Sequence, residues 1–223
     1  MKSIYDYEAA IFDLDGTLAD SMHIWEELFR EFLRDNNIAP PEGFERIIGP
    51  MRLSESASYI ISEFGIDKTP QQVIDEWLGM ALHRYKHTVM LKDGAAELLR
   101  ELSGRGIKLA VATSCFPAAC EAVLCRHGLR ELFCVICYSD DVKRGKAFPD
   151  LWLDCAEKLD VPPQKCVVFE DFPTALSGVR AAGMGFVAVH ESSFAGSFQG
   201  DWQDFSAKAD IAVKSLRELL PTK

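Results

Sequence analysis

The chain of 223 residues contains no apolar run that approaches the roughly 18 residues of a membrane-spanning helix. Basic residues are the minority, since 24 Lys and Arg stand against 34 Asp and Glu, a formal net charge of -10. This balance argues against a protein that binds the nucleic-acid backbone, because such affinity comes from Lys and Arg neutralising phosphates. The N-terminal stretch MKSIYDYE carries acids where a signal peptide needs an apolar region. We therefore expect a cytoplasmic protein that binds neither nucleic acid nor membrane.

A disulfide framework is missing as well. The seven cysteines form an odd count and are spread through apparent strands and helices, which indicates reduced thiols packed in the core. Cys134 and Cys137 form a C-x-x-C, but residues three apart on a strand point to opposite faces. We interpret these two as ordinary core cysteines and not as a metal or redox pair.

What is present is the composition of an ordinary folded protein, with 48% hydrophobic and 26% charged residues. The run from Ala9 to Phe12 is apolar throughout, as in strands buried on both faces. From Ser21 to Thr88 helical periodicity prevails, and after Lys92 strand and helix patterns alternate, which predicts a parallel sheet. The predicted fold is α/β, a Rossmann-like parallel-sheet core domain with an inserted all-helical domain. The expected boundaries are 1–19 and 89–223 for the core and 20–88 for the insertion.

Local signals predict where the helices of the inserted segment begin and end. Asp20 or Ser21 can cap a first helix, which Pro40 and Pro41 end. A second helix is expected near 54–64, and Thr69 followed by Pro70 begins a third. The apolar face of the third helix comprises Val73, Trp77, Met80, Ala81 and Tyr85. Strands of the sheet are expected at 9–12, 107–113, 133–138, 166–169, 185–189 and 210–213.

Two carboxylates stand at the carboxyl end of the first strand, the end at which open α/β sheets bind ligands. Asp13 and Asp15 alternate with apolar residues there, and Gly16 lets the backbone turn sharply. At an effective dielectric of about 20, two like charges ~4 Å apart repel by ~4 kcal/mol, so something cationic should complete the site. The alternative is a strand followed by an ordinary Asp-Gly turn.

Polar residues follow later strands in the same way. Thr113 and Ser114 close one strand and precede a helix, a natural phosphate cradle whose alternative is a simple helix cap. Lys146 lies in a loop, where an isolated lysine is usually just solvated. Glu170 and Asp171 directly follow the apolar strand CVVF, where two acids are costly without a cation. Hard carboxylate oxygens without His or Cys indicate Mg²⁺ and not zinc.

In this order, the D-x-D-G-T stretch and the three later motifs resemble the four motifs of the haloacid dehalogenase-like superfamily. The resemblance covers the whole chain and is to the branch with a helical cap after the first motif, as in β-phosphoglucomutase and phosphoglycolate phosphatase. It implies a magnesium-dependent phosphatase that hydrolyses a small phosphorylated metabolite, such as a sugar phosphate, through an aspartyl-phosphate. The helical segment would then be a cap that closes over the substrate.

The resemblance also implies a role for each matched residue. Asp13 would be the nucleophile, Asp15 the general acid and base, and Thr113 and Lys146 the catalytic ligands of the phosphoryl group and its charge. Mg²⁺ would be held by Asp13, the main-chain carbonyl of Asp15, Asp171 and Glu170. The expected substrate-binding residues are Ser114 and Arg52, the latter in the stretch GPMRLSES, where a solvated arginine is the alternative.

Two other functions are compatible with these motifs. One is a β-phosphoglucomutase-like phosphosugar mutase, although relatives close to that enzyme often carry a histidine where this chain has Trp25. The other is a catalytically inert binding or regulatory scaffold. Asp15 favours phosphate esters, because dehalogenases do not keep this second aspartate. The expected partner is a small-molecule phosphate ester, and the expected assembly is a monomer or weak dimer.

Overall fold

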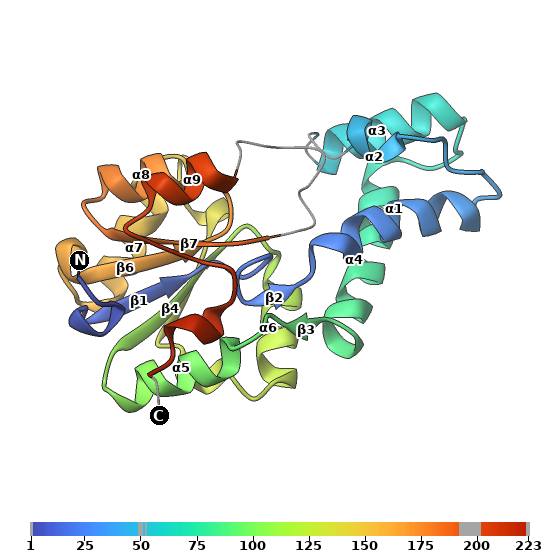
Figure 1. Cartoon of the computed structure of the whole chain (residues 1–223). Coiled ribbons are helices and arrows are strands. Elements are labelled where there is room, and N and C mark those ends of the chain that lie inside the picture. Colours follow the sequence, from blue (N-terminus) through green and yellow to red (C-terminus); the bar gives the residue numbers. More distant parts are fainter. Residues whose placement is uncertain (1, 49–50, 52, 192–201, 222–223) are drawn as a thin grey trace.

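Six parallel strands form the central sheet of the computed structural model, which describes residues 2–48, 51, 53–191 and 202–221. The strands are β1 (Ala9–Phe12), β4 (Lys108–Thr113), β5 (Val135–Tyr138), β6 (Cys166–Glu170), β7 (Gly185–Val189) and β8 (Ile211–Val213). Their order is β5-β4-β1-β6-β7-β8 (Figure 1). Phe12 of β1 lies opposite Val111 of β4 on one side and Phe169 of β6 on the other. The carboxyl ends of these three strands therefore meet at one edge of the sheet.

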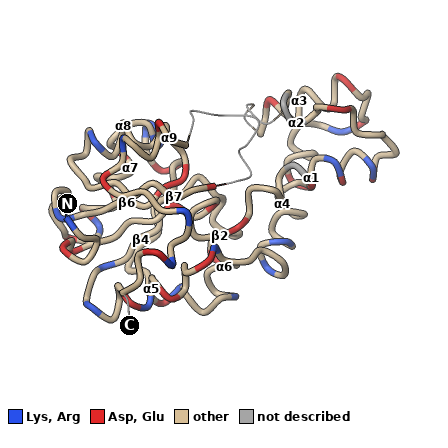
Figure 2. Tube along the Cα trace, in the orientation of Figure 1, with Lys and Arg blue, Asp and Glu red and all other residues tan. Residues whose placement is uncertain are grey.

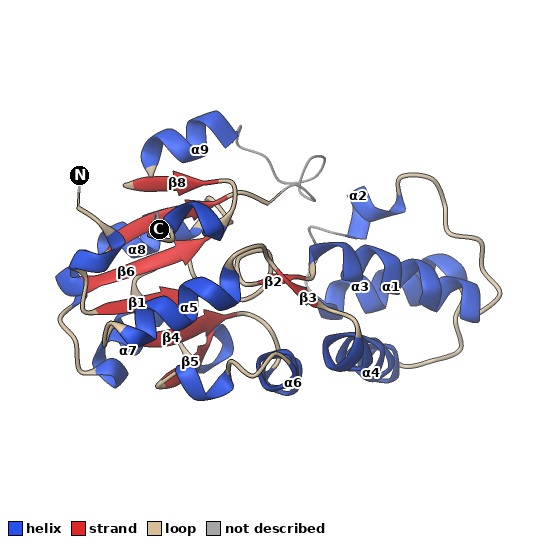
Figure 3. Ribbon diagram, turned by 60° about the horizontal axis from the view of Figure 1, so that its bottom comes forward, coloured by secondary structure: helices blue, strands red, loops and turns tan. Residues whose placement is uncertain are grey.

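Helices cover both faces of this sheet (Figure 3). One face packs against α5 (Ala95–Gly104) and α6 (Pro117–Arg126), the other against α7 (Asp150–Leu159), α8 (Ala175–Ala181) and α9 (Trp202–Lys208). Successive residues of β1 alternate between the two apolar layers, and all four are completely buried. Burial on both faces explains why β1 is apolar throughout instead of alternating with polar residues. The predicted α/β, Rossmann-like sheet is confirmed.

The chain leaves the sheet after β1 and returns before α5 through a small antiparallel pair, β2 (Ala19–Asp20) and β3 (Met90–Leu91). Between them lie α1 (Met22–Asp35), α2 (Phe44–Ile48), α3 (Leu53–Phe64) and α4 (Pro70–His87), beside the sheet in Figure 1. These helices share an apolar cluster of their own, in which Phe29 and Phe32 each form a T-shaped ring pair with Trp77. In the described part of this segment the secondary structure is helical, as the periodicity predicts.

Short 3₁₀ helices complete the described elements, at Ile4–Asp6, Arg130–Leu132, Ser139–Asp141, Pro163–Lys165 and Leu216–Leu219. No helix within the described ranges is long and apolar enough to cross a membrane. Lys and Arg are interspersed with Asp and Glu along the trace (Figure 2).

The helix boundaries agree with the sequence at α4 and differ at α1. Thr69 caps α4, since its hydroxyl accepts a hydrogen bond from the amide of Gln72. The prediction that Pro40 and Pro41 end the first helix is wrong, because α1 ends at Asp35 and Asn37 then adopts a left-handed backbone with φ of +60°. Asparagine tolerates that conformation better than most residues, so the chain turns before it reaches the prolines.

The cysteines are all free. Five are buried, but Cys125 and Cys134 are exposed, so the prediction of packed thiols is wrong for these two. Cys137, in the edge strand β5, is buried, although Cys134, just before this strand, is exposed.

Candidate active site

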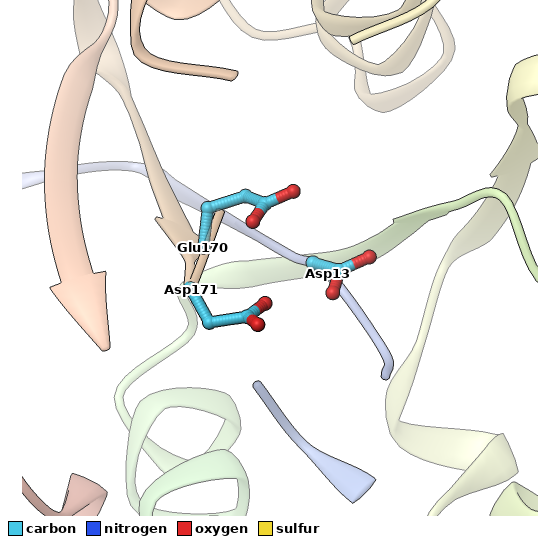
Figure 4. Close-up of side chains that lie close together, drawn as sticks. All are labelled: Asp13, Glu170 and Asp171. Atoms are coloured by element: carbon cyan, nitrogen blue, oxygen red, sulfur yellow. The ribbon is translucent and has the colours of Figure 1, made fainter. Parts of the chain in front are cut away.

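Three carboxylates meet at the carboxyl ends of β1 and β6. Asp13 directly follows β1, Glu170 is the last residue of β6, and Asp171 comes next. One oxygen from each lies within 4.8 Å of the other two, and Figure 4 shows the three groups close together. Their exposures are only 4%, 0% and 8%. Buried carboxylates this close repel one another unless a cation or hydrogen-bond donors satisfy them, so the cluster is a site for positive charge.

Lys146 supplies one such charge from the loop between β5 and α7. Its ammonium donates a hydrogen bond to Oδ1 of Asp13 and another, 2.7 Å long, to Oε1 of Glu170. The second oxygen of Glu170 accepts a bond from the main-chain amide of Phe172 at 2.8 Å. Both oxygens of Glu170 are thus engaged, which makes this residue an anchor for the lysine.

Burial sets the protonation of this cluster. It raises the pKa of Asp13 to about 7, with Lys146 opposing the rise and the charges of Glu170 and Asp15 adding to it. Burial also raises the pKa of Asp171 well above its usual range, and Glu170 and Asp13 add to that rise. For Lys146, burial favours a lower pKa, but the two carboxylates outweigh it and the pKa is raised, so the ammonium stays charged. An additional cation would stabilise the ionised form of both aspartates.

The turn after β1 fits closely against the end of β6. Gly16 has a φ of +88°, and a Cβ at this position would lie 2.4 Å from Oδ2 of Asp171. Glycine is therefore required both by the backbone conformation and by the lack of space. Thr17, the next residue, is fully buried and its hydroxyl donates to Oδ1 of Asp171 at 3.0 Å.

Asp15 is bound by residues from the inserted helical segment. The hydroxyl of Ser21 donates to its Oδ1 at 2.5 Å, and the hydroxyl of Tyr85 donates to the same oxygen. Burial raises the pKa of Tyr85 well above its usual value, and the charge of Asp15 adds to the rise. Tyr85 therefore keeps its proton and acts as a donor. Ser21, one of the two residues expected to cap the first helix, stands at the N-cap position but makes no capping bond with its side chain.

The hydroxyl residues of the second motif lie at the same edge of the sheet, at the end of β4. Thr113 is fully buried, and its hydroxyl accepts a bond from the amide of Cys115 at 2.9 Å. Ser114 is exposed, and its hydroxyl lies 2.9 Å from that of Ser139 at the end of β5. Arg52, the other expected substrate-binding residue, lies outside the described residues.

The structure thus brings together Asp13, Lys146 and the adjacent pair Glu170 and Asp171, from three distant parts of the sequence. The order of the motifs, together with their positions at strand ends of one predicted sheet, indicated this grouping. The sequence did not predict the hydrogen bonds of Thr17, Ser21 and Tyr85. Their positions are typical of a turn residue, a helix cap and an apolar helix face.

Comparison with known proteins identifies a family and several relatives. A family model described as haloacid dehalogenase-like hydrolase matches residues 7–183. A validoxylamine A 7'-phosphate phosphatase from Streptomyces hygroscopicus subsp. limoneus is 28% identical over 216 residues, 96% of each chain. The fructose-1-phosphate phosphatase YqaB of Escherichia coli (strain K12) is 32% identical over 191 residues, 82% of this chain and 96% of that protein.

A solved structure extends the likeness to three dimensions. The crystal structure of CbbY from Rhodobacter sphaeroides in complex with phosphate superposes with a TM-score of 0.77 at 25% identity, over 96% of both chains. The match of the family model over most of the chain, together with these relatives, shows the family. The chain belongs to the haloacid dehalogenase-like hydrolases.

Proposed function

We propose that the protein is a magnesium-dependent phosphatase that hydrolyses a small phosphorylated metabolite, such as a sugar phosphate, through an aspartyl-phosphate on Asp13. The observation that carries the proposal is the buried cluster of Asp13, Glu170 and Asp171 with Lys146 bonded across it. Two relatives support the substrate class, because both are named phosphatases of a phosphorylated compound and one of these is fructose 1-phosphate.

Asp13 suits the role of nucleophile better than Asp15 does. Lys146 bonds to one oxygen of Asp13, and the other oxygen has no hydrogen-bond donor among the described residues. That oxygen can attack the phosphorus atom, forming an acyl-phosphate bond while the bond to the ester oxygen breaks. Splitting the hydrolysis into transfer to Asp13 and hydrolysis of the phosphoenzyme replaces one difficult step by two easier ones.

Asp15 is the proposed general acid and base. It would give a proton to the leaving ester oxygen in the first step and take one from the attacking water in the second. The hydroxyls of Ser21 and Tyr85 bind one of its oxygens and so limit the orientations of the carboxyl group. Thr113 and Ser114 would donate to oxygens of the transferred phosphoryl group from the end of β4.

The donor set fits Mg²⁺. Three carboxylates within 4.8 Å of one another offer only hard oxygen ligands, and none of them is a histidine or cysteine. Asp13, Asp171 and the main-chain carbonyl of Asp15 would hold the ion, and Glu170 adds charge while it anchors Lys146. When bound, Mg²⁺ offsets the repulsion between an anionic phosphoryl group and the carboxylate that attacks it.

We further propose that residues 20–88 act as a cap on a core of residues 1–19 and 89–223, in the cytoplasm. Such a cap excludes water from the reacting groups and contacts the leaving group, which would place substrate selection in the helices. Arg52 belongs to this segment and is proposed to contact the substrate.

The test is phosphate release from a panel of phosphorylated metabolites, with Mg²⁺ and with a chelator. Asp13→Asn should lower turnover on the order of 10⁴-fold or more, because it removes the nucleophile. Asp204→Asn is the matched control, since that carboxylate is exposed on α9 and pairs with Lys208. Retained turnover in Asp13→Asn contradicts the mechanism. An absence of release from every ester favours the mutase or the inert scaffold, which a trapped phosphoaspartate and sugar-phosphate isomerisation distinguish.

A further inference from the structure

The loop that carries Lys146 is held by its backbone as well as by its ammonium group. The main-chain carbonyl of Lys146 accepts a hydrogen bond from the indole N–H of Trp152 at 2.9 Å. Trp152 is completely buried in the first turn of α7. Side chains in a helix lean toward its N-terminus, so a residue in the first turn is well placed to reach the loop in front of it.

A glycine on the neighbouring helix lets this loop come close. A Cβ at Gly178 of α8 would lie 2.2 Å from the carbonyl oxygen of Lys146 and 2.5 Å from that of Phe148. The same Cβ would lie 2.8 Å from the indole nitrogen of Trp152. The carbonyl of Lys146, the indole N–H of Trp152 and the backbone of Gly178 therefore meet in close contact. Ser177, beside this glycine, donates from its hydroxyl to the carbonyl of Ala147 at 2.9 Å.

Fixing this backbone matters because of the side chain that starts from it. A lysine side chain has several rotatable bonds, and holding its ammonium in one place costs conformational entropy. The ammonium of Lys146 must nevertheless meet Asp13 and Glu170 together. A backbone anchor at the start of the chain reduces the number of positions that the ammonium can reach.

We propose that Trp152 is a positioning residue for phosphoryl transfer, acting through Lys146 by the hydrogen bond from its indole N–H. This inference rests on the role proposed above for Lys146. Trp152 is not itself a catalytic residue, since the structure shows its polar atom bonded to the lysine backbone and not to the carboxylate cluster.

The first test compares two Trp→Phe substitutions. Trp152→Phe removes the N–H while keeping an aromatic ring, and we expect kcat to fall about 5- to 20-fold. Trp77→Phe is the matched control, because Trp77 is equally buried but its indole nitrogen has no hydrogen-bond partner among the described residues. We expect less than a twofold change in kcat for the control. An equal effect of the two substitutions overturns the proposal.

The second test is a double-mutant cycle with Lys146→Ala. If Trp152 acts through Lys146, adding Trp152→Phe to Lys146→Ala should change kcat less than twofold. A general structural role would instead give the same loss in both backgrounds, which overturns the proposal. The same cycle can be measured without turnover, by isothermal titration with inorganic phosphate in the presence of Mg²⁺. Trp152→Phe should weaken phosphate binding in the otherwise wild-type protein and leave it unchanged in Lys146→Ala.

A misfolded variant, an absent phosphatase activity and an absent role of Trp152 must be told apart. Circular dichroism checks that each variant folds, and if Trp152→Phe does not, β-(3-benzothienyl)alanine at position 152 replaces the N–H by sulfur at nearly constant volume. A wild-type protein that releases no phosphate from any ester contradicts the proposed function. An active wild type with a large loss in Lys146→Ala and none in Trp152→Phe contradicts only the role of Trp152.

Discussion

The hydroxyl of Tyr85 donates a hydrogen bond to Oδ1 of Asp15, which lies 70 positions earlier in the chain. Tyr85 lies near the end of α4, the last helix of the inserted segment, and Ser21, just before α1, donates to the same oxygen. The two ends of the helical segment therefore meet at one carboxylate oxygen. The group proposed to transfer protons is thus bound by the insertion as well as carried by the turn after β1.

Replacing Tyr85 by phenylalanine tests this link. Tyr85→Phe removes one of two donors to a charged acceptor, an interaction of about 1.5–3 kcal/mol, so we expect kcat to fall on the order of 10- to 100-fold. Steady-state kinetics on the best ester of the panel measures it. Tyr5→Phe is the control, because Tyr5 precedes β1 at the opposite end of the strand, where its hydroxyl donates to the carbonyl of Leu219. Equal kcat values for the two variants contradict a role for the Tyr85 hydroxyl in proton transfer.

The sequence predicts the helix that carries Tyr85 but not the bond that it makes. Periodicity places Tyr85 on an apolar face, and burial confirms this, yet its hydroxyl partner is distant in sequence and no local pattern encodes it. The same holds for Ser21, whose position favours a helix cap while its hydroxyl is bonded to Asp15. Which of two possible partners a side chain binds depends on the tertiary structure, and a local sequence pattern does not encode it.

The carboxylate cluster could be predicted because of a general property of parallel sheets. Acids that follow apolar strands gather at the carboxyl edge, so Asp13, Glu170 and Asp171 are expected together once their strands are recognised. The order of the strands could not be predicted, because strand pairing leaves no trace in the periodicity. The hydrogen bond from the indole of Trp152 to the loop could not be predicted either, since it depends on how closely α8 approaches that loop.

The stability of the metal-free protein should depend on pH through Asp13. The pKa of this residue is about 7 in the folded protein, above its usual 3.8, because burial disfavours the charged form. Between these two values the folded state binds more protons than the unfolded state, so the free energy of unfolding falls as pH rises from about 4 to 7. A rise of about three pKa units corresponds to at most ~4 kcal/mol. Urea unfolding with chelator at pH 5 and pH 8 should show the part of this loss that falls above pH 5, at most about 3 kcal/mol, in wild type and a smaller one in Asp13→Asn. An identical pH dependence of stability in the two proteins contradicts a raised pKa at Asp13.

Mg²⁺ should stabilise the folded protein through Asp171. A ligand that binds only the folded state adds about 2.7 kcal/mol to the free energy of unfolding at 100 times its Kd, so the melting temperature should rise with Mg²⁺. Asp171→Asn should remove most of this rise, because it neutralises one of three buried carboxylates in the cluster. Asp204→Asn, on the exposed side of α9, should leave the rise unchanged. Differential scanning calorimetry measures the melting temperatures, and a full response in Asp171→Asn contradicts the proposed metal site.

Alanine substitutions at Gly178 and Gly79 should have opposite effects on the stability of the protein. Both lie within helices, where alanine is favoured over glycine by about 1 kcal/mol. Gly79→Ala adds a methyl group in open space and should stabilise the protein by about that amount. Gly178→Ala places the methyl group against the carbonyl oxygens of Lys146 and Phe148, and overpacking of this kind typically costs about 1–3 kcal/mol. Urea unfolding should therefore show Gly178→Ala to be less stable than Gly79→Ala, and kcat should fall only in Gly178→Ala, because the displaced backbone carries the ammonium away from Asp13. If Gly178→Ala is as stable and as active as Gly79→Ala, the loop moves aside without cost, and the position of its backbone does not control Lys146.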